Sequence, residues 1–236
     1  MSKSKPKPRL LCLHGARSND EIAAYQIAGL NLQKRFECVY LHAPHVTKPA
    51  PGLEHFSEGP FYAWADPSKS ISDQEDQWNE SLGYIAEYCT RDGPFDGVYG
   101  FSQGASMITN FSHPSTASWK KTRFETTRAQ RPPWKFAILA CGAGGHRITA
   151  SRAGSTTAII DIPSFHIFGK KDTLLNDSRV VAEYWSPSRR ITHAHGRGHE
   201  IDMQMHVREV EMMRKLHAYL DEHSVVIERG FGAGVR

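Results

Sequence analysis

The chain has 236 residues, of which 39% are hydrophobic and 23% are charged. This balance is too apolar for wholesale disorder, and no apolar run approaches the roughly 18–20 residues that a membrane helix needs. The 29 lysines and arginines outnumber the 25 aspartates and glutamates by only four, and they are scattered, which argues against a nucleic-acid-binding protein. We therefore expect an ordinary soluble domain with a substantial core.

The cysteines and the chain ends indicate a reducing compartment. The four cysteines form no CxxC pair, which favours reduced, buried thiols over disulfides or a zinc site. The basic N-terminus is followed by too short an apolar stretch for a signal peptide. We expect a cytoplasmic protein, with the nucleus as an alternative. The expected organisation is a disordered segment 1–8, a single domain over 9–222 and a tail over 223–236.

The first third of the chain predicts two strands and a helix. Residues 10–13 form a short apolar run that predicts a buried strand. Asn19 or Asp20 can cap a helix over about 20–35, and residues 38–41 predict the second strand. The next segment, 45–71, is rich in proline and glycine and predicts a long loop, whose aromatic side chains we expect to pack over a pocket.

The rest of the chain continues to alternate helices and strands. Ser72-Asp73-Gln74-Glu75 has the capping-box pattern and predicts a helix from Ser72 to about Arg91. We expect loops over 112–133 and 142–158. The further predicted strands are 95–99, 136–140, 164–168 and 190–194, and the further predicted helices begin near 105 and span 177–185 and 202–222. This alternation predicts an α/β fold, with a mostly parallel sheet and helices on both faces.

The segment Gly100-Phe101-Ser102-Gln103-Gly104 carries the strongest chemical signal. It matches G-x-S-x-G and lies between an apolar strand and a helical segment, as a nucleophile elbow requires. A sharp turn there exposes the serine hydroxyl at the carboxyl edge of the sheet, and small flanking residues let the strand and helix backbones approach. The alternative is a glycine-rich turn that holds a serine by chance. Ser102 is the predicted nucleophile.

A serine nucleophile needs a basic histidine and an orienting acid, which follow the serine in the order acid, then histidine, in this fold. Asp172 comes shortly after the predicted strand 164–168, so its carboxylate should lie at the carboxyl edge of the sheet. A turn or capping role is the alternative for Asp172. Asp177 more readily caps the following helix, and Asp161 precedes the strand, at the opposite edge.

The predicted base is His199. It lies in Gly196-Arg197-Gly198-His199-Glu200, where the glycines allow the loop to fold over the edge of the sheet. His195, in the same loop, is the alternative base.

Two backbone N–H groups should form an oxyanion hole. One belongs to Gln103, the residue after the nucleophile, and the other to Ala16, in the loop that follows the first strand. Gly15 permits the turn of that loop. We expect His14 to be a structural hydrogen-bonding residue rather than a proton carrier.

With these residues placed, the chain resembles the FSH family of serine hydrolases, which includes the human ovarian-cancer-associated hydrolase, yeast members and fungal polyketide-releasing thioesterases. The resemblance extends over about residues 9–222. It is carried by the elbow segment 93–105, the first strand and its His14-Gly15, the segment 163–169 with Asp172, and Gly198-His199.

The resemblance implies an α/β-hydrolase fold and cleavage of carboxylic esters or thioesters, with Ser102, Asp172 and His199 as the catalytic triad. It also implies that the aromatic stretch containing Phe61, Tyr62 and Trp64 contributes to the substrate pocket. Ala16 is smaller than the residue that family members often carry after His-Gly, so we expect a wider acyl side of the site.

The main hypothesis is therefore a serine hydrolase without cofactor or metal. It would act on a small-molecule ester or thioester through an acyl-enzyme intermediate, with no nucleic-acid partner and no membrane span. One alternative keeps the fold but assigns a non-catalytic role in binding a ligand or partner. Another is an acidic-surface or nucleic-acid binder that uses the basic residues of 120–131. A dinucleotide site is not expected, because residues 14–17 lack G-x-G-x-x-G.

Overall fold

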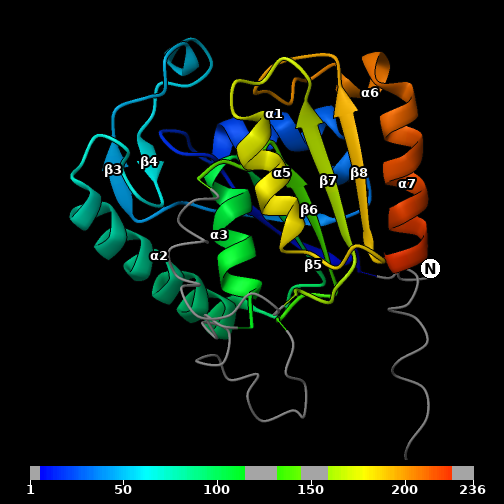
Figure 1. The fold of residues 1–236 in the computed structure, drawn as a ribbon, viewed down its shortest axis with the longest axis horizontal. Coiled ribbons are helices and arrows are strands. Elements are labelled where there is room, and N and C mark those ends of the chain that lie inside the picture. Colours follow the sequence, from blue (N-terminus) through cyan, green and yellow to red (C-terminus); the bar gives the residue numbers. More distant parts are fainter. Residues whose placement is uncertain (1–5, 115–131, 145–158, 225–236) are drawn as a thin grey trace, which may run out of the picture.

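Six parallel strands form a single sheet at the centre of the computed structural model, which describes residues 6–114, 132–144 and 159–224 (Figure 1). The order across the sheet is β2-β1-β5-β6-β7-β8. Their bounds are β1 (Arg9–Leu13), β2 (Glu37–Leu41), β5 (Gly97–Phe101), β6 (Phe136–Ala140), β7 (Ser164–Gly169) and β8 (Arg190–His195). Every predicted strand is confirmed to within two residues, and so is the predicted α/β fold with a parallel sheet.

Helices cover both faces of the sheet. Side chains of α2 (Ile71–Asp92), α3 (Gln103–Ser112) and α5 (Leu175–Glu183) pack into the core on one face. Side chains of α1 (Asp20–Gly29) and α7 (Val210–Ser224) pack into the core on the other face. Every residue of β5 and β6 is buried, which explains why these strands are apolar runs without alternation. No helix within the described residues is long and apolar enough to cross a bilayer.

Two helices differ from the helices that the sequence predicts. α1 begins after Asn19, whose Oδ1 accepts the Ile22 N–H at 3.1 Å, but it stops at Gly29 and a short 3₁₀ helix, η1 (Leu32–Lys34), follows. Gly29 lies directly against the backbone near Asp202: a Cβ there would come 2.0 Å from the Asp202 carbonyl oxygen. The last predicted helix is interrupted at Glu209 and forms α6 (Met205–Arg208) and α7.

The segment 45–71 is not a simple loop, which corrects the prediction. β3 (His45–Thr47) and β4 (Phe61–Ala63) pair as a small antiparallel hairpin, and η2 (Leu53–His55) lies between them. Ser18 joins this hairpin through reciprocal backbone hydrogen bonds with Tyr62, of 3.1 and 2.7 Å. Each strand has only three residues, too few for alternation to show in the sequence.

The start of α2 also differs from the prediction. Ser70 is the N-cap, with its Oγ accepting the Asp73 N–H at 3.1 Å, whereas Ser72 lies inside the first turn. Replacing Ser70 by alanine should therefore lower the free energy of unfolding by about 1 kcal/mol. The same change at Ser72, which is also exposed, should change it by less than about 0.5 kcal/mol. Urea denaturation checks both; equal effects would contradict this assignment of the cap.

Several predictions fall outside the described residues. Most of the segments 112–133 and 142–158, expected to be loops, lies there, as do all the basic residues of 120–131 and most of both chain ends. All four cysteines are described and none is in a disulfide. Three of them are buried as expected, whereas Cys38 on the edge strand β2 is partly exposed.

Candidate active site

Three strands end at the same edge of the sheet and bring the predicted site residues together. Ser102 follows β5 directly, Asp172 follows β7, and His199 lies in the loop after β8. His199 Nε2 lies 2.8 Å from Ser102 Oγ, and His199 Nδ1 lies 2.7 Å from Asp172 Oδ2. The three residues thus form a continuous hydrogen-bonded series across the carboxyl edge of the sheet.

Ser102 occupies a backbone conformation that L-residues rarely adopt, with φ 54° and ψ −119°. The elbow also requires close backbone approach on both sides. A Cβ on Gly100 would come 2.8 Å from the Ala105 nitrogen, and one on Gly104 would come 2.5 Å from the Leu13 carbonyl oxygen. These contacts explain why glycine flanks the serine, and strain of this kind is typical of a functional turn.

Asp172 is held in place by its surroundings. Its side chain is fully buried, and while Oδ2 faces His199, Oδ1 accepts the Leu174 N–H at 2.7 Å. Asp177 is not the cap of α5, contrary to the prediction: it lies within the first turn and its Oδ2 accepts the Gly144 N–H at 3.3 Å. Asp161 is exposed beside Arg189, away from the site.

His199 is positioned by its neighbours in the loop and on the sheet. Its ring centroid lies 5.1 Å from that of Phe101, and its side chain is 29% exposed. The following turn is fixed by Arg197, which pairs with Glu200 at 2.7 Å and with Asp202 at 3.2 Å. The alternative base, His195, does not reach the serine: it is the buried last residue of β8, and its Nδ1 accepts the Arg197 N–H at 3.2 Å.

The His14 ring fixes the peptide group that joins Gly15 to Ala16. His14 Nδ1 lies 2.7 Å from the Gly15 carbonyl oxygen, and Nε2 accepts the Ala43 N–H at 3.0 Å. A ring that donates from Nδ1 and accepts at Nε2 is neutral, and burial lowers the pKa of His14 to about 4. In a trans peptide the C=O and N–H point in opposite directions, so this bond aims the Ala16 N–H away from the ring.

Gln103 follows Ser102 in the chain, and Ala16 follows Gly15, on which a Cβ would come 3.2 Å from the Ser102 Cβ. Neither the Gln103 N–H nor the Ala16 N–H has an acceptor among the described residues. The side chain of Gln103 is itself used structurally. Its Oε1 accepts the Trp64 N–H at 2.9 Å, and its Nε2 donates to the Ala65 carbonyl at 2.8 Å. Trp64 Nε1 in turn donates to the His14 carbonyl at 2.8 Å.

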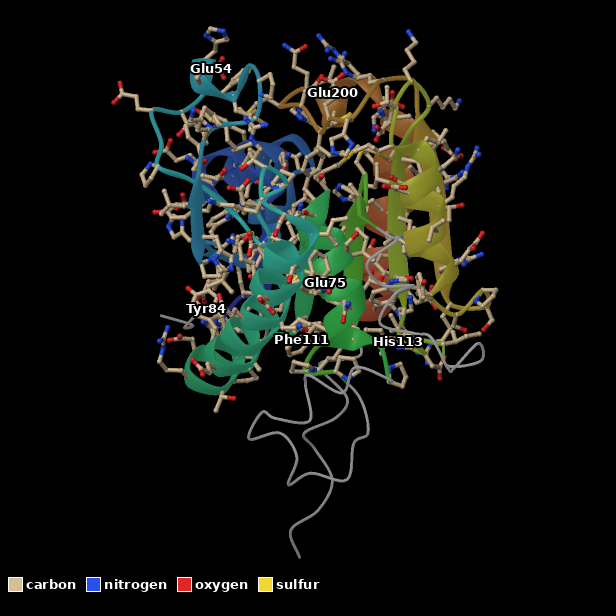
Figure 2. All side chains as sticks on the ribbon, turned by 60° about the vertical axis from the view of Figure 1, so that its left-hand side comes forward. Glu54, Glu75, Tyr84, Phe111, His113 and Glu200 are labelled. Atoms are coloured by element: carbon tan, nitrogen blue, oxygen red, sulfur yellow. The ribbon has the colours of Figure 1, made fainter. Side chains whose placement is uncertain are left out.

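A cavity of about 580 Å³ opens beside Ser102 and His199. Phe61, Tyr62 and Trp64, the expected pocket residues, do not line it; Phe61 and Trp64 are buried. Its apolar wall residues include Ile22, Leu53, Phe56, Phe101, Ile201 and Met203. Figure 2 shows Glu200, which also lines the cavity, at the same end of the molecule as Glu54 of η2 and opposite Phe111 and His113.

Cys141 lies close to Asp172 and His199, although no sequence pattern indicates that it belongs to the site. It follows β6 directly, is fully buried, and has a φ of 48°. Its Sγ, a carboxylate oxygen of Asp172 and a ring nitrogen of His199 all lie within 4.8 Å of one another. Burial raises the pKa of the thiol to about 12. The adjacent positions of β6 and β7 in the sheet account for the proximity to Asp172.

Comparison with known proteins agrees with this architecture. The chain is 33% identical over 213 residues to esterase FPY3 of Fusarium mangiferae, with 82% of this chain and 88% of that protein covered. It is 30% identical over 220 residues to family of serine hydrolases 3 of Saccharomyces cerevisiae, with 82% and 77% covered.

Solved structures give the fold. A carboxylesterase of Bacillus cereus superposes with a TM-score of 0.52 at 18% identity, over 92% of this chain and 89% of that chain. The sequence profile of the serine hydrolase (FSH1) family matches residues 1–209. The chain therefore belongs to the FSH1 serine hydrolase family and is a hydrolase that acts on ester bonds.

Proposed function

We propose that Ser102, His199 and Asp172 are the catalytic triad of this ester hydrolase. The observation that carries the proposal is the unbroken series of hydrogen bonds from Ser102 Oγ through the His199 ring to Asp172, at 2.8 and 2.7 Å. A serine hydroxyl is a weak nucleophile at neutral pH, and a neutral imidazole at this distance can accept its proton as the oxygen attacks a carbonyl carbon.

Asp172 supports the ring in two ways. Its carboxylate accepts a hydrogen from Nδ1, which leaves the Nε2 lone pair directed at Ser102, and it stabilises the imidazolium that forms after proton transfer. The free N–H groups of Ala16 and Gln103 would bind the oxyanion of the tetrahedral intermediate.

Collapse of that intermediate releases the alcohol or thiol and leaves an acyl group on Ser102. His199 first gives its proton to the leaving group and then takes one from water, which attacks the acyl-enzyme and regenerates the serine. The acid is the second product. Because only backbone donors and these side chains are needed, the same site can act on oxygen esters and on thioesters.

The cavity favours an apolar acyl group. Aliphatic, aromatic and methionine side chains make up much of its wall, and the space of about 580 Å³ lies directly beside Ser102. Burying apolar surface there contributes about 25 cal/mol per Å² to binding. We therefore propose medium-sized apolar carboxylic esters or thioesters as substrates.

Hydrolysis of p-nitrophenyl esters of increasing acyl length, run beside matching acyl thioesters, tests this proposal. We expect kcat/KM to rise with acyl length until the acyl group fills the cavity, and we expect Ser102→Ala to be inactive toward every substrate on which the wild type acts. Wild-type protein that hydrolyses none of them, or a Ser102→Ala variant that retains the activity, would favour a non-catalytic binding role.

Replacing His14 should separate catalysis from stability, because its two ring nitrogens have different partners. Asparagine can place an amide N–H near the position of Nδ1 and so keep the bond to Gly15, whereas glutamine can place an oxygen near Nε2 and keep the bond to Ala43. If the Gly15 bond aims the Ala16 N–H, His14→Gln should lower kcat by about 100-fold, the order expected for losing one oxyanion donor.

In His14→Asn, kcat should fall by less than about tenfold. Its free energy of unfolding should fall more than that of His14→Gln, because the buried Ala43 N–H is left without an acceptor. Steady-state kinetics and urea unfolding of the two variants check this. If kcat falls in both in step with stability, His14 has only a structural role.

A further inference from the structure

Cys141 adds a third metal-binding side chain to the Asp172–His199 pair. Its thiol, the Asp172 carboxylate and the His199 imidazole offer one sulfur, one oxygen and one nitrogen, and these atoms lie within 4.8 Å of one another. The three residues follow the carboxyl ends of the neighbouring strands β6, β7 and β8, so the order of strands in the sheet brings them together.

The ligand types at this site are those that Zn²⁺ binds, and the distances between the ligand atoms are close to those of a zinc site. Zn²⁺ binds thiolate at about 2.3 Å and imidazole or carboxylate at about 2.0–2.2 Å, usually with four tetrahedral ligands. Ligand atoms around such an ion are about 3.3–3.7 Å apart. Asp172 Oδ2 and His199 Nδ1 are now 2.7 Å apart and would need to separate by about 0.6 Å to reach this spacing. The Cys141 sulfur would need to move closer to these two atoms by up to about 1 Å.

The charges also balance. A thiolate and a carboxylate together neutralise a divalent cation, which matters because Cys141 and the Asp172 side chain are fully buried. A buried ion is tolerated only when it is compensated in this way. The sulfur ligand favours soft or borderline ions over Mg²⁺ and Ca²⁺, which prefer oxygen.

We propose that Cys141, Asp172 and His199 form an inhibitory site for a thiophilic divalent cation such as Zn²⁺. The ion takes the lone pair of His199 Nδ1 in place of the hydrogen bond to Asp172, and water fills the fourth position. The ring stays neutral by carrying its proton on Nε2, and the Cys141 thiol releases one proton to solvent. Nε2 then faces Ser102 as a donor and can no longer accept the serine proton.

The inhibition rests on the proposed function of the triad, whereas the binding does not. We would therefore measure ester hydrolysis at increasing buffered Zn²⁺ and express each rate relative to the metal-free rate of the same variant. Wild type should be inhibited reversibly, with activity restored by chelator. The Cys141→Ser variant should require at least about tenfold more Zn²⁺ for half-maximal inhibition, because a hydroxyl is a far weaker ligand for this ion than a thiolate.

Cys38→Ser is the matched control, since Cys38 is the partly exposed cysteine and the one that an ion reaches most easily from solvent. It should remain as sensitive to Zn²⁺ as the wild type. Equal sensitivity of Cys141→Ser and the wild type, or relief of inhibition by Cys38→Ser alone, would overturn the proposal.

Cd²⁺ binding to the Ser102→Ala variant gives a second measurement that needs no turnover. We expect one ultraviolet cadmium–thiolate absorption band per chain that disappears when Cys141→Ser is added and persists when Cys38→Ser is added. If this band appears as expected but the wild type hydrolyses no ester, the metal site stands and the catalytic proposal fails. If the wild type hydrolyses esters but the band does not depend on Cys141, the metal site is wrong.

Discussion

Replacing His199 by alanine should lower kcat by about 10⁶-fold, and adding Ser102→Ala to that variant should lower it little further. His199 Nε2 is 2.8 Å from Ser102 Oγ, so the two residues act as one unit: without the base the hydroxyl is not activated, and without the hydroxyl the base has nothing to activate. The residual rate would come from the oxyanion donors and substrate binding.

Initial rates on a p-nitrophenyl ester check this, with circular dichroism to establish that each variant is folded. His206→Ala is a suitable control, because His206 lies exposed on α6 and outside the described series. If the fold-losses in kcat of the two single variants multiply in the double variant, Ser102 and His199 act independently and the triad proposal is wrong.

Asp172→Asn should lower kcat by about 10⁴-fold while leaving the fold intact. The asparagine oxygen can still accept the Leu174 N–H that Oδ1 accepts now at 2.7 Å. Its amide group, however, donates to His199 Nδ1, which forces the ring proton onto Nε2 and removes the acceptor that Ser102 needs. The defect is therefore in the tautomer of the ring rather than in its position.

Asp177→Asn is the matched control for this substitution. Asp177 is five residues further along the chain, and its only described carboxylate bond is to the Gly144 N–H at 3.3 Å. Its variant should keep kcat within about twofold, as expected for a substitution away from the reacting atoms. A larger loss at Asp177 than at Asp172 would transfer the role of the acid to Asp177.

The site residues could be predicted because each follows a strand or a glycine turn that the sequence makes visible. Ser102 lies in the five-residue pattern G-x-S-x-G, and Asp172 follows a buried strand. His199 follows Gly198 in a loop at the same edge of the sheet. Parallel strands bring their carboxyl ends together, so local patterns were sufficient to place residues nearly one hundred positions apart.

The walls of the cavity could not be predicted in the same way. Ile201 and Met203 turn into it because Arg197 fixes the loop through Glu200 and Asp202, a set of contacts that no sequence periodicity encodes. The β3–β4 hairpin has strands of only three residues, too short to show in the sequence, and it places Trp64 where its Nε1 donates to the His14 carbonyl.

Cys141 illustrates the same limit, since only the order of strands in the sheet shows that it lies beside Asp172. The early end of α1 is also a tertiary effect, because Gly29 packs against the backbone near Asp202. Local propensity is overridden where backbones meet this closely.

Labelling with a fluorophosphonate, followed by peptide mass mapping, tests whether His199 activates Ser102 as the nucleophile. Reactivity of one serine toward this electrophile requires both the exposed elbow and the neighbouring imidazole. We expect one adduct per chain, on Ser102, that forms rapidly in the wild type and far more slowly in His199→Ala. A wild-type protein that is not labelled, is labelled at another serine, or is labelled at Ser102 equally fast without His199 would contradict it.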